Sequence, residues 1–156
     1  MPYSVLTRKM IKHQGSVLVS TLVTMGILSI LFAVSIPFFR QYQPNLQLTG
    51  TARELTTDLR YAQQLTISEQ VAHYVEFNTS LDTYLIIKGG TATTTVKTVA
   101  LPAEVGFQSV VGFTDDRVRF NSYGAVTESG DITLVNTNGQ TKIISVKPSG
   151  YVQLAQ

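Results

Sequence analysis

The chain has 156 residues, a formal net charge of +2 and no cysteine, which excludes a disulfide framework and a thiolate metal site. Three of its twelve Lys and Arg residues fall within the first 15 positions, where there is no acidic residue. Beyond that leader the cations and the ten Asp and Glu residues nearly balance, so net charge gives no reason to expect a general attraction to DNA or anionic lipid.

An uncharged segment, Ser16 to Phe39, follows the basic leader. As a helix this segment is ~36 Å long at 1.5 Å per residue, enough to cross a hydrocarbon core of ~30 Å with some tilt. The cationic leader should stay in the cytoplasm, which places everything after Phe39 on the other side. The sequence therefore predicts a single-pass, membrane-anchored protein with an exported C-terminal domain.

Two ordinary interpretations of this N-terminus are available. A secretory signal peptide has an apolar region of about 7–15 residues and a small-x-small cleavage site. Here the apolar run is longer and ends at Ile36 to Arg40 without such a site. An uncleaved signal anchor explains the length and the positive flank. It does not explain a glycine, Gly15, at the boundary between the basic and apolar regions, or Pro37 near the far end.

The next region, residues 40–70, is expected to be a linker and an amphipathic helix. Pro44 should interrupt or kink any helix that continues from the membrane. From Thr51 to Glu69 apolar residues recur at steps of three or four, which predicts a helix with one buried face. Its charged residues are interpreted as solvated helix charges. The apolar positions are Ala52, Leu55, Leu59, Ala62 and Leu65, and the charged ones are Arg53, Glu54, Asp58 and Arg60.

Residues 71–156 have the alternation and turn signals of a β-rich head. Asn138-Gly139, between two apolar runs, is the strongest hairpin signal. The fold class predicted is α+β, with the helical part followed by an antiparallel β-sheet or sandwich. The strands are expected at Val71–Phe77, Thr83–Lys88, Thr91–Ala100, Val105–Val111, Arg117–Asn121, Ile132–Val135, Lys142–Val146 and Tyr151–Leu154.

The sequence offers little catalytic chemistry. His13 lies in the leader, and His73 is interpreted as a half-buried or surface strand residue without a partner for proton transfer. Asp115-Asp116 could suit calcium, but a turn after Gly112-Phe113 explains the pair as well. No phosphate-binding loop, nucleophile triad or metal-ligand cluster is present. We therefore expect a protein that is not an enzyme and that has no cofactor and no metal.

The N-terminus resembles the class III signal of type IV pilins and type II secretion pseudopilins. In that family a prepilin peptidase cuts after a glycine and methylates the new N-terminus. The resemblance implies cleavage between Gly15 and Ser16 and methylation of Ser16. Leu18 and the Ile36-Pro37 pair also match the family pattern. It further implies that the partners are the peptidase, other pilins in a helical filament, and the assembly platform and ATPase in the bacterial inner membrane.

The later chain is similar to the GspH/FimT group of minor pseudopilins. Leu55-x-x-x-Leu59-Arg60-x-Ala62-x-x-Leu65 runs straight into a strand, and Ile132 to Tyr151 resembles that group's last hairpin and closing turn. Major pilins and competence pseudopilins share the same anchor. The expected domains are residues 1–15 as leader, 16–39 as transmembrane and filament-core helix, 40–70 as linker and helix, and 71–156 as exported head.

These features predict a minor pilin or pseudopilin, drawn from the membrane lipid into a type IV pilus or a type II secretion pseudopilus. Pro37 is expected to break or loosen the helix during extraction. The family usually has Glu at the fifth mature position, where this chain has Ser20. A subunit without that carboxylate is expected to lie at or near the filament tip.

Two other functions remain open. Some FimT-like proteins bind DNA through a Gly-Arg-x-Arg motif, but at the matching place this chain has Gly150-Tyr151-Val152-Gln153. Because both cations are missing, DNA binding is not expected, although Arg117, Arg119, Lys142 and Lys147 could form a patch. The other alternative is a plain signal-anchored β-domain without a filament role.

Overall fold

The structure, a computed structural model, describes residues 11–90 and 92–155. The chain forms two compact units, Met1–Tyr42 and Gln43–Gln156, which we call the anchor unit and the head. One α-helix, α1 (Ile11–Glu69), supplies the described part of the anchor unit and the first element of the head.

Two prolines lie inside α1 instead of at a break in it. Of the interruption or kink predicted at Pro44, the interruption is wrong, because helical residues continue on both sides of it. The helix also continues through Pro37. The loosening expected at Pro37 during extraction from the membrane remains a prediction. Proline removes one helical hydrogen bond, but its fixed φ of about −65° is compatible with a helix. The ring of Pro44 is buried in the head, and that burial offsets part of the loss.

The head part of α1 buries the apolar face that the periodicity predicts. Leu48, Ala52, Leu55, Leu59 and Ala62 are at most 1% exposed, and each lies three or four residues from the next. The prediction fails only at its C-terminal end, where Leu65 is half-buried and Thr66 is fully buried.

Eight antiparallel strands follow, which confirms the predicted α+β fold. The first four-stranded sheet has the order β3-β2-β1-β5 and the second has the order β4-β6-β7-β8. The bounds are β1 His73–Asn78, β2 Thr83–Lys88, β3 Thr94–Ala100, β4 Val105–Val111, β5 Arg117–Phe120, β6 Gly130–Asn136, β7 Thr141–Val146 and β8 Val152–Ala155. A short 3₁₀ turn, η1 (Thr114–Asp116), precedes β5.

The hairpin predicted at Asn138-Gly139 joins β6 to β7. The side-chain oxygen of Asn136 accepts hydrogen bonds from the backbone N–H groups of Asn138 (3.1 Å) and Gln140 (2.8 Å). Gly139 has φ +76°, a conformation that glycine adopts at little cost. The turn is thus encoded by its own local residues.

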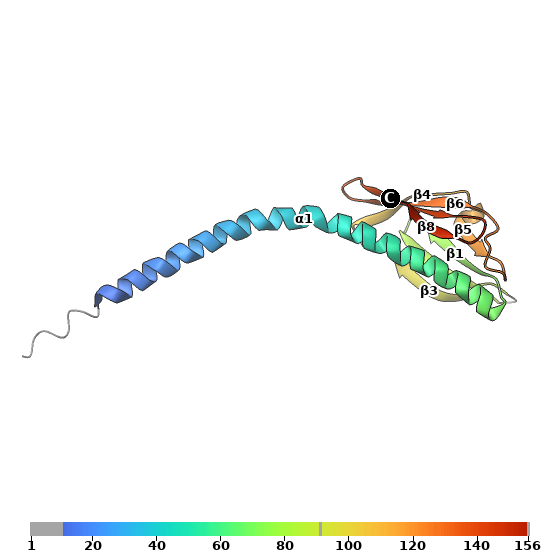
Figure 1. The fold of residues 1–156 in the computed structure, drawn as a ribbon, viewed down its shortest axis with the longest axis horizontal. Helices are drawn as coiled ribbons and strands as arrows, with labels where there is room; N and C mark the ends of the chain where they lie inside the picture. The colour runs from blue at the N-terminus through green and yellow to red at the C-terminus, as the bar shows by residue number, and fades with distance from the viewer. Residues whose placement is uncertain (1–10, 91, 156) are drawn as a thin grey trace, which may run out of the picture. The chain divides into compact units, whose positions relative to one another are not determined.

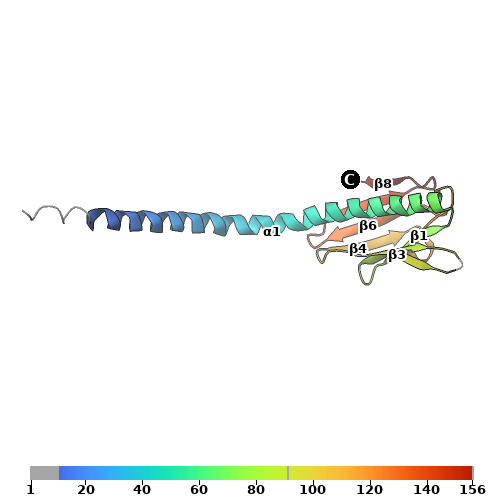
Figure 2. The same cartoon turned by 90° about the horizontal axis from the view of Figure 1, so that it is seen from below.

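One hydrophobic core lies between the head part of α1 and the inner faces of both sheets. In Figures 1 and 2 this part of the helix runs along the strands. Phe77 of the first sheet and Phe107 of the second meet edge to face at 5.6 Å between ring centroids. In β1 alternate residues point into this core, since Val75 and Phe77 are buried and their neighbours are not.

Candidate functional site

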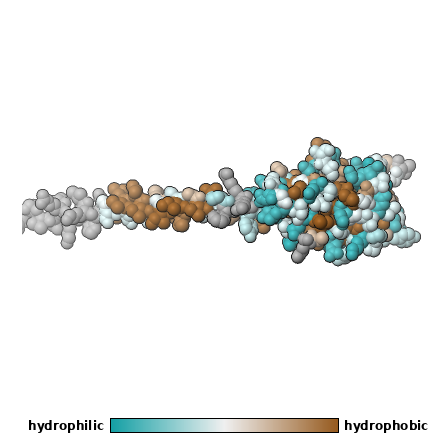
Figure 3. Space-filling view, turned by 90° about the horizontal axis from the view of Figure 1, so that it is seen from above, coloured by the Kyte–Doolittle hydropathy of each residue, from teal (hydrophilic) through white to brown (hydrophobic). Residues whose placement is uncertain are grey.

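The anchor unit presents an uncharged helical segment from Gly15 to Pro37, and none of it is buried within the protein. Its 23 residues are long and apolar enough to cross a membrane. Figure 3 shows this stretch as a run of hydrophobic residues, in contrast to the mixed surface of the head. A helix that leaves this much apolar surface uncovered requires lipid or other helices around it.

Four hydroxyl side chains of this segment are hydrogen-bonded within the helix. The hydroxyl groups of Thr21, Thr24, Ser29 and Ser35 each donate to a carbonyl one turn earlier, at 2.8–3.0 Å. Such bonds lower the cost of placing a hydroxyl in an apolar medium, where no water is available. These four side chains are therefore compatible with a membrane environment.

The predicted site residues of the anchor lie within α1. Gly15 and Ser16 are exposed helical residues, and a side chain added at Gly15 would meet no atom within 4 Å. Ser20 is exposed, and its carbonyl accepts the hydrogen bond of Thr24. Residues 1–10, most of the predicted leader, lie outside the described residues. Cleavage and methylation at this junction remain predictions.

Asp58 is not the solvated helix charge that the sequence suggests. Its side chain is 9% exposed and accepts hydrogen bonds from the buried Tyr84 hydroxyl at 2.7 Å and from the Lys97 amine at 2.7 and 2.8 Å. Burial, and secondly the bond to Asp58, raises the pKa of Tyr84 well above its usual range. Asp58 thus links α1 to strands β2 and β3.

His73 is also more buried than expected, with no exposed surface. Its Nδ1 lies 2.8 Å from the Val71 carbonyl, and its Nε2 lies 3.6 Å from the Glu69 carboxylate. That carboxylate pairs with Lys88, and this hydrogen bond lowers the pKa of Glu69. The cluster holds the end of α1 against the first sheet and has the geometry of a structural contact.

The cations considered for a DNA-binding patch do not gather. Arg117 pairs with Glu76 at 3.0 Å and lies over the Tyr74 ring, while Arg119 pairs with Asp115 at 3.1 Å. Lys142 and Lys147 belong to or follow β7 in the other sheet. The same ion pair bears on the calcium site considered at Asp115-Asp116, because the Asp115 carboxylate already pairs with Arg119. No group of three potential metal ligands occurs within residues 11–90 and 92–155.

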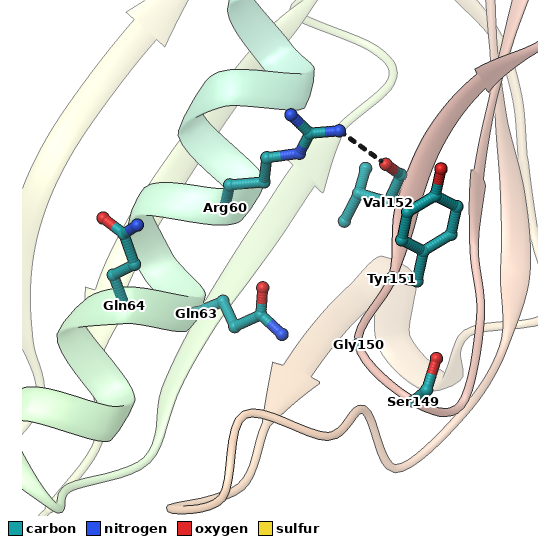
Figure 4. A pocket seen from close by; sticks show the side chains of 7 residues that line it. All are labelled: Arg60, Gln63, Gln64, Ser149, Gly150, Tyr151 and Val152. Carbon is teal, nitrogen blue, oxygen red and sulfur yellow. Dashed lines mark hydrogen bonds between the residues drawn. The ribbon is translucent and has the colours of Figure 1, made fainter.

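A groove of about 530 Å³ lies between α1 and the turn that joins β7 to β8 (Figure 4), and we call it the Arg60 groove. One guanidinium nitrogen of Arg60 donates to the Val152 carbonyl at 3.0 Å. The Gln63 amide donates to the Gly124 carbonyl at 2.6 Å. The groove is lined by Arg60, Gln63, Gln64, Ser149, Gly150, Tyr151 and Val152.

Sequence reasoning did not find the Arg60 groove, since it interpreted Arg60 as a solvated charge. The only available signal was the glycine of the closing turn. Gly150 has φ +79°, and a Cβ there would collide with the Gly124 carbonyl and the Gln63 amide. A position where only glycine fits indicates that segments distant in sequence lie in close contact there.

The chain thus combines an N-terminal apolar helix with a two-sheet antiparallel head. The model of one family, Type II transport protein GspH, matches residues 51–150, which is more than half of the chain. The chain therefore belongs to the GspH family. No curated protein sequence matches it.

Two solved structures share the fold. The minor pseudopilin EpsH of the Vibrio cholerae type 2 secretion system aligns with a TM-score of 0.61 and 10% identity, covering 70% of this chain and 96% of that one. The type IV minor pilin FimU of Pseudomonas aeruginosa (strain PAO1) aligns with a TM-score of 0.60 and 16% identity, covering 74% of this chain and 92% of that one. At these identities the likeness is one of fold.

Proposed function

We propose that the protein is a minor pilin or pseudopilin, an anchored structural subunit of a type II secretion pseudopilus or a type IV pilus. The observation that carries the proposal is the combination of an exposed, uncharged helix at Gly15–Pro37 with a head of the GspH family. Such a helix can exchange lipid contacts for helix–helix contacts at little hydrophobic cost, since lipid tails and leucine are similarly apolar.

The anchor is proposed to cross the bacterial inner membrane once, with the leader in the cytoplasm. The basic residues before Gly15 and the uncharged stretch after it support this orientation. A prepilin peptidase would remove Met1–Gly15 and methylate Ser16. The assembly platform and its ATPase would then move the subunit from lipid into the filament.

Processing is tested by replacing Gly15 with leucine. The Gly15→Leu chain should insert normally, because the apolar segment is unchanged, but it should keep residues 1–15. Intact mass spectrometry of membrane-extracted protein would show a shortened, methylated wild type and a full-length variant. Equal masses for the two chains would refute the peptidase step and leave the plain signal anchor.

Ser20 supports a place at or near the filament tip. In the family, Glu at this position is thought to pair with the N-terminal amine of the preceding subunit. An unpaired carboxylate within a membrane helix is costly, so its usual presence implies a partner. Ser20 avoids the cost of an unpaired carboxylate but cannot pair with the amine of a preceding subunit. A subunit at the tip has no preceding subunit, so it does not need this pairing.

The tip position predicts a restricted distribution in filaments. Immunogold labelling of sheared filaments with an antibody to the head should mark their ends and leave their sides unlabelled. Label spread evenly along the length would contradict a tip position, while the subunit role itself would stand.

A further inference from the structure

We propose that the Arg60 groove binds a carboxylate carried by an extended segment of a partner protein chain. The inference rests on the proposed function, because a filament subunit has neighbouring subunits as partners. Figure 4 shows the guanidinium of Arg60 and the side chains of Gln63, Ser149 and Tyr151 around one opening between the helix and the turn. The groove is thus lined by one cationic side chain, two amides and two hydroxyl groups, together with Gly150 and Val152.

A hydrogen bond within the head orients the guanidinium of Arg60. Its bond to the Val152 carbonyl uses one of the five N–H donors of a guanidinium. Because the side chain is exposed, the other donors can face a ligand, and the planar fork suits a carboxylate. A donor that is already oriented loses less conformational freedom on binding.

Unlike most other cationic side chains of the head, Arg60 has no ion pair with a carboxylate among the described residues. Lys88, Lys97, Arg117 and Arg119 each lie within 4.0 Å of a carboxylate. Arg60 has no such ion pair among the residues that the structure describes, and no acidic residue is among those lining its groove. An incoming carboxylate would supply the missing counter-charge.

The other lining residues suit a peptide. Gln64 is an exposed amide, and Tyr151 is 54% exposed. Amides can pair with the N–H and C=O groups of an extended segment, and exposed Tyr and Arg side chains are enriched where proteins bind one another. The groove therefore fits a largely neutral peptide with one acidic side chain.

A nucleic acid fits this surface less well. Binding to phosphates strengthens with each cation that contacts the backbone, and the groove has one. Residues 43–156 contain eight Lys and Arg against ten Asp and Glu, so a polyanion would meet a net negative head.

The test is biolayer interferometry on the full chain in uncharged detergent micelles. The probes are two biotinylated, amidated peptides of alternating Thr and Val, one with a central Asp and one with Asn in its place, and a twelve-nucleotide oligo-dT. The Asp peptide should bind about tenfold more tightly than the Asn peptide, as expected for a gain of ~1.4 kcal/mol from a charged hydrogen bond.

Three variants test whether the preference for the Asp peptide depends on Arg60. Arg60→Gln should reduce binding of the Asp peptide to that of the Asn peptide. Gln64→Glu should do the same without removing any atom of Arg60, because the new carboxylate lies one turn along the helix and pairs with the guanidinium. Arg53→Gln removes an exposed cation from the same helix outside the groove and should leave the preference unchanged.

Each remaining result would overturn the inference. Equal binding of the two peptides to the wild type would exclude a carboxylate site. Equal losses in Arg53→Gln and Arg60→Gln would indicate general charge attraction. Oligo-dT binding that needs Arg60, without a preference for the Asp peptide, would indicate a nucleic-acid site. The proposed function is judged separately, because Arg60→Gln should still be shortened at Gly15.

Discussion

Gly150→Ala is expected to lower the free energy of unfolding of the head by about 3–4 kcal/mol, near the upper end of single-residue effects. Two costs add at this position. The backbone has φ +79°, where an L-residue with a Cβ is strained by roughly 1–2 kcal/mol. The new Cβ would also collide with the Gly124 carbonyl and with the Gln63 amide, so the helix and two turns must separate.

Gly139→Ala is the matched control for Gly150→Ala. Gly139 has nearly the same backbone conformation, φ +76°, but a Cβ there would meet no atom within 4 Å. Only the backbone strain of about 1–2 kcal/mol should remain. Urea unfolding of the full chain in non-ionic detergent, followed by near-ultraviolet circular dichroism of its tyrosines, would measure both. Equal losses would show that the contacts of Gly150 contribute nothing.

The strands were predictable because their signals are local. The alternation of Val75 and Phe77 with polar neighbours, and the Asn138-Gly139 turn, depend on residues only a few positions apart. A period of two residues is typical of a pleated strand with one buried face, and turn residues mark its ends. The family resemblance at the N-terminus depends on a short motif in the same way.

The wrong predictions concern residues whose role depends on distant partners. The helical pattern places Asp58 outside the apolar face, but its carboxylate is buried and accepts hydrogen bonds from Tyr84 and Lys97. These partners lie 26 and 39 positions later in the sequence. Local propensity likewise predicted an interruption or kink at Pro44, but the helix continues there, and burial of the ring in the head offsets part of the lost hydrogen bond. The Arg60 groove forms because residues 60 and 150 lie close together in the fold, and no periodicity in the sequence predicts that contact.

The Asp58 contact also predicts a large effect on stability. Asp58→Ala should lower the free energy of unfolding by about 2–4 kcal/mol, because the Tyr84 hydroxyl, in a residue that is 1% exposed, loses its acceptor and Lys97 loses its nearest counter-charge. Glu54, at 4.0 Å from the Lys97 amine, is too exposed to replace it.

Adding Tyr84→Phe to Asp58→Ala distinguishes the lost hydrogen bond of the Tyr84 hydroxyl from the lost pairing with Lys97. Removing both partners leaves no buried hydroxyl without an acceptor, so the double variant should be more stable than Asp58→Ala by about 1–2 kcal/mol. The control is Asp131→Ala, which removes an equally short bond, 2.6 Å to Ser145, from an exposed position and should cost under about 0.5 kcal/mol. The same urea unfolding measures all three. If the double variant is less stable than Asp58→Ala, the Tyr84 hydroxyl is not the source of the loss, and Asp58 acts mainly through its pairing with Lys97.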